Sequence, residues 1–155
     1  MSDKLEGRCA CGAVRYRLAS APMFVHCCHC LDCQRQTGSA FAVNALIETD
    51  RVEALEGAVT SVTLPTDSGR PLIAVGCAAC RTGLWLHYGG RMATAFVRVG
   101  TLEDPTALAP DVHIFTRSKQ PWVGLPDGVP VFEAYYDMKA LWPAASWDRL
   151  VATRR

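Results

Sequence analysis

Four cysteines fall within seven residues in the stretch CCHCLDC, which runs from residue 27 to residue 33. Three of them, Cys28, Cys30 and Cys33, form the pattern C-x-C-x-x-C, which lets three thiolates converge on one metal ion from a tight turn. Three protein ligands leave one position of a tetrahedral zinc ion open, and an open position distinguishes a catalytic zinc ion from a structural one. Such an ion can bind a water or a substrate thiol, or polarise a carbonyl. The spacing therefore predicts a catalytic zinc site at these cysteines.

A fourth ligand from the same stretch would close this site, and the candidates are Cys27 and His29. Adjacent residues of an extended chain point to opposite sides, so Cys27 and Cys28 would need an unusual backbone to share one ion. A thioredoxin-like redox role is disfavoured, because that motif begins a helix in a βαβ unit and no such unit is legible in this sequence. We favour the open site, with His29 as the candidate proton shuttle, and keep the closed site as the alternative.

The other four cysteines form two further pairs, Cys9-Ala-Cys11 and Cys77-Ala-Ala-Cys80, each at a turn beside a β-type run. A zinc ion with four protein ligands is structural, since no position remains for a substrate. Pairing the two motifs would connect distant parts of a small β domain and contribute folding free energy. The sequence thus predicts two zinc ions per chain, one structural and one catalytic.

The composition is that of an ordinary globular protein. A chain of 155 residues can bury one hydrophobic core, so we expect a single domain over residues 1–155. The formal net charge is +1, with 16 Lys and Arg against 15 Asp and Glu. A nucleic-acid-binding protein usually carries a clustered basic face, whereas the basic residues of this chain are scattered. Nucleic acid is therefore not an expected partner.

The amino-terminal segment MSDKLEGRCACG lacks the apolar core of a secretory signal. No window approaches the roughly 18 to 20 apolar residues of a membrane span. We therefore expect a cytoplasmic protein without a membrane partner. In that reducing compartment closely spaced cysteines bind metal or do redox work more often than they form disulfides, which agrees with the metal-site interpretation.

Short β-type runs dominate the chain and helical periodicity is weak, so the fold class should be mainly β with few short helices. The runs cover residues 13–18, 39–47, 60–64, 71–75, 84–88 and 93–99. Turn signals separate them at Glu56-Gly57, 65–69 (PTDSG), Gly89-Gly90 and Asp104-Pro105. From residue 117 onward the segment is irregular, and the closing stretch 144–155 predicts one short helix with Ser146 as its N-cap.

Six stretches together make a recognisable pattern: GRCACGAVRY (7–16), CHCLDCQRQTG (28–38), CAAC (77–80), GTLEDP (100–105), HIF (113–115) and QPW (120–122). The pattern resembles the family of glutathione-dependent formaldehyde-activating enzymes, which is also named for centromere protein V. The resemblance extends from about residue 6 to residue 135. Two features depart from the family pattern: Arg81 stands where a glycine commonly follows the second C-x-x-C, and Cys27 is an additional thiol.

The resemblance implies a small, tent-like, mainly β domain stapled by two zinc ions. It also implies a carbon-sulfur lyase that joins glutathione or a similar thiol to formaldehyde or a related small aldehyde, so a small-molecule thiol and aldehyde are the expected partners. A non-enzymatic zinc-binding interaction module of the same fold is the alternative. The implied ligands are Cys9, Cys11, Cys77 and Cys80 for the structural ion, and Cys28, Cys30 and Cys33 for the catalytic ion.

Residues near the three-cysteine motif are candidates for substrate binding. Arg35 can offset thiolate charge or bind a carboxylate of glutathione. Thr37 and Gly38 can supply hydroxyl and backbone contacts, and Trp122 can line a groove from the proline-rich segment. Two histidines of β-type runs are expected to be structural: His87 and His113.

Overall fold

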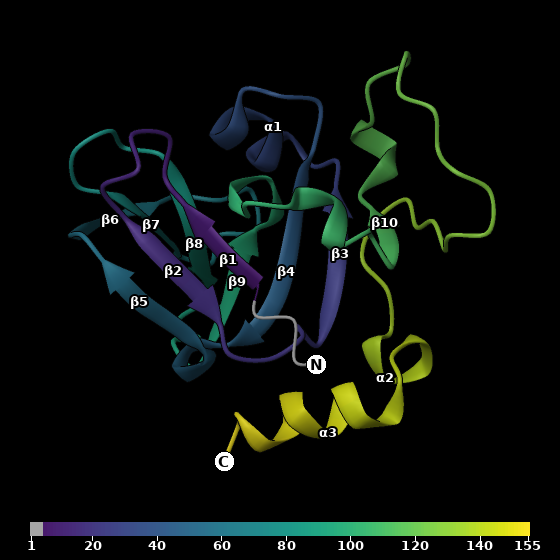
Figure 1. Ribbon diagram of the computed structural model, residues 1–155. Helices are drawn as coiled ribbons and strands as arrows, with labels where there is room; N and C mark the ends of the chain where they lie inside the picture. The colour runs from purple at the N-terminus through teal and green to yellow at the C-terminus, as the bar shows by residue number, and fades with distance from the viewer. Residues whose placement is uncertain (1–4) are drawn as a thin grey trace.

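The computed structural model describes residues 5–155, and within that range ten strands form two sheets, which confirms a mainly β fold (Figure 1). The first four residues, MSDK, lie outside the described range. The expectation that the amino-terminal segment is not a secretory signal falls partly on these residues. The smaller sheet is antiparallel in the order β1-β2-β5. Its strands are β1 (Leu5–Arg8), β2 (Arg15–Leu18) and β5 (Val52–Glu56).

The larger sheet has the strand order β10-β3-β4-β9-β8-β7-β6. Neighbouring strands are antiparallel except β10, which runs parallel to β3. Its strands are β3 (Phe24–Cys28), β4 (Ala42–Glu48), β6 (Val59–Leu64), β7 (Leu72–Cys77), β8 (Gly83–Tyr88), β9 (Thr94–Arg98) and β10 (Val112–Ile114).

Short helices complete the described chain, and none of those within residues 5–155 is both long and apolar enough to span a membrane. Residues 119–137 contain no helix or strand, as expected for an irregular carboxyl-terminal segment. Within them, Val131 forms an isolated β-bridge with His113 of the preceding segment. The α-helices are α1 (Leu31–Thr37), α2 (Met138–Leu141) and α3 (Ala144–Ala152). The 3-10 helices are η1 (Thr49–Arg51), η2 (Val99–Thr101), η3 (Pro105–Ala107) and η4 (Thr116–Ser118).

Each of the six predicted β-type runs overlaps one observed strand, namely β2, β4, β6, β7, β8 or β9, and no run covers β1 or β5. Strand β3 was missed because all five of its residues are buried, so no alternation of apolar and polar residues marks it. Strand β10 has only three residues. The turn at Glu56-Gly57 is confirmed: Gly57 has a φ of +84°, and a Cβ there would lie 2.1 Å from the carbonyl oxygen of Ala13. Only glycine fits that position.

The main hydrophobic core lies between the two sheets. Tyr16 and Leu18 of β2 pack in one cluster with Ala45 of β4 and Val97 of β9. The Tyr16 ring meets the ring of Trp85 edge-on, with the ring centroids 5.8 Å apart. Because residues 9–14 lead directly into β2, this core fixes their position relative to the larger sheet.

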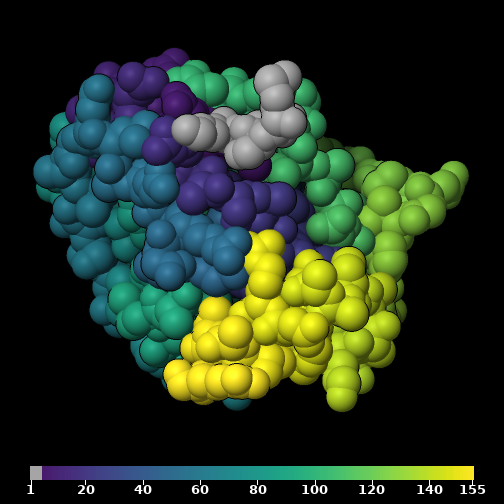
Figure 2. All heavy atoms as spheres, turned by 60° about the horizontal axis from the view of Figure 1, so that its bottom comes forward, coloured from purple at the N-terminus to yellow at the C-terminus, as the bar shows by residue number. Residues whose placement is uncertain are grey.

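The carboxyl-terminal segment covers the other face of the larger sheet. Phe24 of β3 stacks on Trp142 with ring centroids 5.0 Å apart, and Leu150 of α3 belongs to the same cluster. Figure 2 shows the carboxyl-terminal residues, in yellow, as a continuous layer beside segments from the first half of the chain. Cys28 belongs to this cluster too, so the layer packs on the face of β3 that carries Cys28.

Helix α3 begins earlier than the sequence predicts. It covers Ala144–Ala152, and Pro143 occupies the N-cap position. The carbonyl of Pro143 accepts a hydrogen bond from the N–H of Trp147 at 3.0 Å, as an N-cap carbonyl does. Ser146 therefore lies inside the first turn, and its predicted capping role is wrong.

A two-point ion pair holds α3 against the sheet. Arg149 donates from Nε to Oε1 of Glu48 at 2.8 Å and from Nη2 to Oε2 at 2.6 Å. The side chain of Glu48 is only 11% exposed. Burial raises the pKa of Glu48, but the hydrogen bonds and charge of Arg149 prevail and hold this pKa below its usual 4.5. The pair therefore stabilises the folded state only while Glu48 is ionised.

We expect Arg149→Met to lower the free energy of unfolding at pH 7 by about 2 kcal/mol, because it removes the closest and only hydrogen-bonded arginine partner of a mostly buried carboxylate among the described residues. The folded pKa of Glu48 lies below the unfolded value of about 4.5, so the contribution is complete above that pH and is lost as the pH falls through the folded pKa. Thermal denaturation followed by circular dichroism from pH 7 to about 3 should show the wild type and the variant converging.

Arg51→Met is the matched control, since Arg51 lies 3.6 Å from the same carboxylate and is more exposed. Arg51→Met should lower the free energy of unfolding by less than half as much as Arg149→Met does. A difference between the wild type and Arg149→Met that stayed constant at every pH would contradict the assignment.

Candidate functional site

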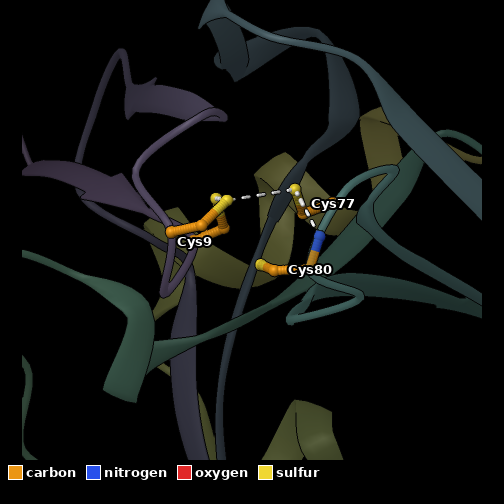
Figure 3. Close-up of side chains that lie close together, drawn as sticks. Cys9, Cys77 and Cys80 are labelled. Atoms are coloured by element: carbon orange, nitrogen blue, oxygen red, sulfur yellow. Dashed lines mark hydrogen bonds between the residues drawn. The ribbon is translucent and has the colours of Figure 1, made fainter.

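Cys9, Cys11, Cys77 and Cys80 come together although the two pairs are far apart in sequence. Their four Sγ atoms all lie within 4.8 Å of one another. The Sγ atoms of Cys9 and Cys11 are 3.5 Å apart, and those of Cys11 and Cys77 are 3.9 Å apart. In Figure 3, Cys9 faces Cys77 and Cys80 from a separate turn. This four-cysteine cluster brings together the residues that the sequence paired, and it could hold a metal ion.

Two similar turns present these cysteines. In the first, the N–H of Cys9 donates to the carbonyl of Val14 at 3.1 Å; in the second, the N–H of Cys77 donates to the carbonyl of Thr82 at 3.0 Å. Directly after its second cysteine, each turn has a residue with positive φ: Gly12 (+78°) and Arg81 (+65°). The arginine thus adopts the backbone conformation that favours glycine, and the turn is preserved.

Hydrogen-bond donors point at the sulfur atoms of the four-cysteine cluster. The N–H of Val14 donates to Sγ of Cys9 at 3.2 Å and lowers the pKa of that thiol. The hydroxyl of Thr82 lies 3.0 Å from Sγ of Cys80, and together with the Thr82 backbone it lowers the pKa of Cys80 to about 5. A lowered pKa favours the thiolate, which is the form that binds metal.

Cys28, Cys30 and Cys33 meet where β3 gives way to α1, with their Sγ atoms within 4.8 Å of one another. Cys28 ends β3, Cys30 is the N-cap of α1, and Cys33 lies in its first turn. The Sγ atom of Cys30 accepts a hydrogen bond from the N–H of Cys33 at 3.4 Å, so the helix cap orients this sulfur. The sequence predicted a tight turn here and missed the helix, whose seven residues are too few to show an apolar period.

In this three-cysteine cluster the surroundings favour the thiolate form of Cys30 over that of Cys28 or Cys33. Hydrogen bonds with Cys28 and Cys33 lower the pKa of Cys30 to about 2, and the hydrogen bond with Cys30 raises the pKa of Cys28. For Cys33, the hydrogen bond with Cys28 lowers the pKa, but Cys30 and burial prevail and raise it to about 11, against the opposing charge of Arg98. A metal ion would displace the remaining thiol protons.

The positive charge of Arg98 lowers the pKa of Cys33, which is the kind of effect that the sequence suggested for Arg35. Sequence reasoning missed Arg98 because its place beside Cys33 depends on the pairing of β9 with β4. Its partner in that pairing is Asn44. The one signal in the sequence is a positive charge near the end of an otherwise apolar run.

Cys27 and His29 do not join the three-cysteine cluster. Cys27 and Cys28 are consecutive residues of β3, so their side chains leave opposite faces of the sheet. The ligand atoms of Cys27 and His29 instead lie close to that of His113. Within residues 5–155, no fourth Cys, His, Asp or Glu groups with the three cysteines, so the geometry supports the open arrangement.

The remaining histidine predictions have mixed outcomes. His87 is buried and its Nδ1 bonds to the carbonyl of Thr94 at 2.8 Å, which confirms a structural histidine. His113, also expected to be structural, lies with its Nδ1 3.0 Å from Nε2 of His29. Burial, followed by the charges of His113 and Lys119, lowers the pKa of His29 to about 4. A neutral ring on the face away from Cys28 does not support His29 as a proton shuttle.

A pocket of about 550 Å³ is lined by Gln36 and Thr37 of α1, the helix that carries Cys33, and by Ala42, the strand partner of Cys28. It reaches from α1 to Trp85 of β8. Arg98 lines it and donates to Oδ1 of Asn44 at 2.6 Å and to Oε1 of Gln36 at 2.7 Å. No ion pair within residues 5–155 includes Arg98, so its charge can serve an anionic ligand.

The predicted substrate-binding residues lie in different places. Thr37 lines the pocket, and its hydroxyl donates to the carbonyl of Cys33 at 2.8 Å. Gly38 ends α1 in the left-handed conformation, with a φ of +65°, and so shapes the helix end beside the pocket. The side chain of Arg35 is 69% exposed, and Trp122 is 76% exposed. Their roles in binding stay predictions.

Known proteins match most of the chain. The family model described as glutathione-dependent formaldehyde-activating enzyme matches residues 4–118. A protein of Halomonas elongata, named provisionally as a glutathione-dependent formaldehyde-activating enzyme, is 27% identical over 126 residues, which cover 77% of this chain and 79% of that protein. The crystal structure of a Rhodobacter sphaeroides protein aligns with a TM-score of 0.52 and 19% identity, covering 83% of this chain and 99% of the other. That structural likeness bears on the fold alone.

We expect Arg81→Gly to raise the free energy of unfolding of the metal-loaded protein by about 1 kcal/mol, because glycine relieves the strain of a positive φ. Urea denaturation followed by tryptophan fluorescence measures this change. Arg91→Gly is the matched control, since Arg91 is exposed and has no positive φ, and it should be slightly destabilising. Equal destabilisation by both substitutions would exclude strain at Arg81.

Proposed function

This chain belongs to the family of glutathione-dependent formaldehyde-activating enzymes, and from that premise we propose that it joins glutathione or a similar thiol to formaldehyde or a related small aldehyde. The bond formed joins carbon to sulfur, so the activity is of the carbon-sulfur lyase type. The observation that carries the proposal is the open three-cysteine cluster, whose helix α1 also lines a pocket with Arg98, an arginine without an acidic partner among residues 5–155.

The donor sets fit zinc, which prefers thiolate ligands in a tetrahedral arrangement. The four-cysteine cluster offers a complete set, as a structural ion requires, and the three-cysteine cluster leaves one position for a substrate. We propose one zinc ion in each. A zinc ion bound by Cys28, Cys30 and Cys33 supplies a Lewis acid that stabilises the thiolate form of the incoming thiol.

The pocket suits a thiol that carries carboxylates. Arg98 and Arg81 both line it, and neither takes part in an ion pair within the described part of the chain. Guanidinium groups bind carboxylates with two parallel hydrogen bonds, and glutathione has two carboxylates. A carboxylate held by Arg98 would place the thiol near α1, whose Gln36 and Thr37 line the pocket.

The proposed reaction balances without an oxidant or reductant. The thiol sulfur attacks the carbonyl carbon of the aldehyde, a carbon-sulfur bond forms, and the carbonyl π-bond opens. The proton that leaves the thiol ends on the former carbonyl oxygen. Binding both reactants in the pocket converts a bimolecular addition into a bound one, and good alignment lowers such a barrier substantially. Positioning by Arg98 and the pocket walls is therefore the main contribution of the chain itself.

The cytoplasm is the compartment that we propose for this activity. All eight cysteines are free thiols in the structure. A reducing compartment keeps cysteines in the reduced form, and the two cysteine clusters can bind metal only through reduced cysteines. The proposed partners are a small thiol and a small aldehyde.

Replacing one ligand of the open cluster tests the proposal. We expect Cys30→Ser to lower the zinc content by one ion per chain and to abolish catalysis of glutathione–formaldehyde exchange, measured by exchange NMR on the same samples. The fold, followed by circular dichroism, should be retained because Cys30 is only partly buried. Ser61→Ala, at an exposed position on β6, is the control and should match the wild type. Zinc without any exchange catalysis in the wild type would overturn the enzyme and favour the interaction module.

Removing the pocket charge tests the substrate class. We expect Arg98→Met to raise the KM for glutathione about 10- to 100-fold, the effect of losing one charge-assisted hydrogen-bonding group. The KM for 2-mercaptoethanol, which has no carboxylate, should change little. Arg70→Met, an exposed arginine outside the pocket lining, is the control. An equal loss with both thiols would show that Arg98 acts on the fold or the cluster rather than on the carboxylate.

A further inference from the structure

A third group of ligand-type side chains lies on the face of β3 away from Cys28. We call it the Cys-His-His cluster, made of Cys27, His29 and His113 of β10. The Sγ atom of Cys27 lies 3.6 Å from Nε2 of His29, and this nitrogen lies 3.0 Å from Nδ1 of His113. The three ligand atoms are all within 4.8 Å of one another. The residues are 1%, 0% and 7% exposed, so the cluster is buried.

The sheet places these side chains on one face. His113 is the direct partner of Cys27 in the parallel pairing of β10 with β3, so both point to the same side. His29 follows Cys27 by two residues and therefore lies on that side as well. Its N–H donates to the carbonyl of Ile114 at 3.0 Å, which keeps the chain beside β10 past the end of β3. The Cys-His-His cluster is thus separate from the three-cysteine cluster.

Hydrogen bonds alone cannot pair all three ligand atoms of this cluster. Nε2 of His29 has either one hydrogen or one lone pair, yet two polar atoms lie beside it. It can pair well with His113 or with Cys27, and not with both. A metal ion at the centre would bind all three ligand atoms at once. Nδ1 of His29 is buried without a partner in either case, so it does not distinguish the two arrangements.

The spacing matches that of ligands around a tetrahedral ion. Zinc–sulfur distances of about 2.3 Å and zinc–nitrogen distances of about 2.0 to 2.1 Å place sulfur and nitrogen ligands about 3.5 Å apart, and two nitrogen ligands about 3.3 Å apart. The corresponding distances in the cluster are 3.6 Å and 3.0 Å.

The residue types suit a metal ion. Histidine binds metal as the neutral imidazole and cysteine as the thiolate, so metal binding to cysteine normally proceeds with loss of the thiol proton.

We propose that Cys27, His29 and His113 form a third metal site, which takes an ion that prefers nitrogen and sulfur donors, represented by Zn²⁺. On binding, the thiol proton of Cys27 leaves to solvent, and one thiolate with two neutral imidazoles surrounds the ion. His113 is also bonded through its backbone to Pro130 and Phe132, both at 2.9 Å. The ion therefore ties the carboxyl-terminal segment to β3, a structural role that is independent of the proposed catalysis.

Counting zinc ions in matched variants tests this site. Wild-type protein, Cys27→Ser, His113→Gln and the double variant would be saturated with Zn²⁺, freed of loosely bound metal and measured by native mass spectrometry. We expect three ions in the wild type and two in each single variant. The double variant should also keep two, because both substitutions remove the same ion. Cys30→Ser removes a different ion, so Cys27→Ser combined with Cys30→Ser should keep one.

Cobalt replacement gives a second readout that does not depend on activity. With Co²⁺ in place of zinc, the difference spectrum between wild type and Cys27→Ser should show the thiolate charge-transfer absorption of a single sulfur ligand. Two ions in the wild type, unchanged by Cys27→Ser and by His113→Gln, would overturn the proposal. If these variants failed to fold, the wild-type count would decide: three ions support the site and two exclude it.

Discussion

The alternation of side chains along β3 is the constraint on which the chemistry of this chain depends. Hydrogen bonds to β4 on one side and β10 on the other hold β3 in its pleat, so its residues cannot rotate between faces. Cys28 is thereby directed toward Cys30 and Cys33, and Cys27 toward His113. A slip of one residue in register would exchange the two faces and dismantle both groups. The sheet therefore decides which thiols can act together.

Charge is the second constraint, because several thiols in a small volume cannot all ionise without compensation. The four-cysteine cluster receives hydrogen bonds from the backbone of its two turns. The three-cysteine cluster instead has one cap hydrogen bond at Cys30 and the nearby guanidinium of Arg98. A metal ion would displace the remaining thiol protons of this cluster. The same arginine lines the pocket. Under the proposed function one cation would act on both the cluster and an anionic substrate, which would link thiolate charge to substrate class.

The sequence sufficed for whatever depends on local spacing. The cysteine motifs, the runs that form β2, β4 and β6 to β9, and the turn at Gly57 all leave marks within a few residues. Strand β3 and helix α1 left none, because one is buried throughout and the other is only two turns long. Arg98 and His113 acquire their neighbours through strand pairing between distant segments. Such contacts arise from tertiary structure, and a single sequence does not encode them in any local pattern.

The family model ends at residue 118, yet later residues pack on the face of β3 that carries Cys28. The hydroxyl of Tyr136 joins Nε2 of His26, at 2.6 Å, to Nε1 of Trp142, at 2.7 Å, and so fastens this layer to the strand. Cys30 and Cys33 pack against the same apolar cluster. The family model thus includes every cysteine of the two cysteine clusters, and residues after 118 join residues inside the family model in the apolar cluster that contains Cys28.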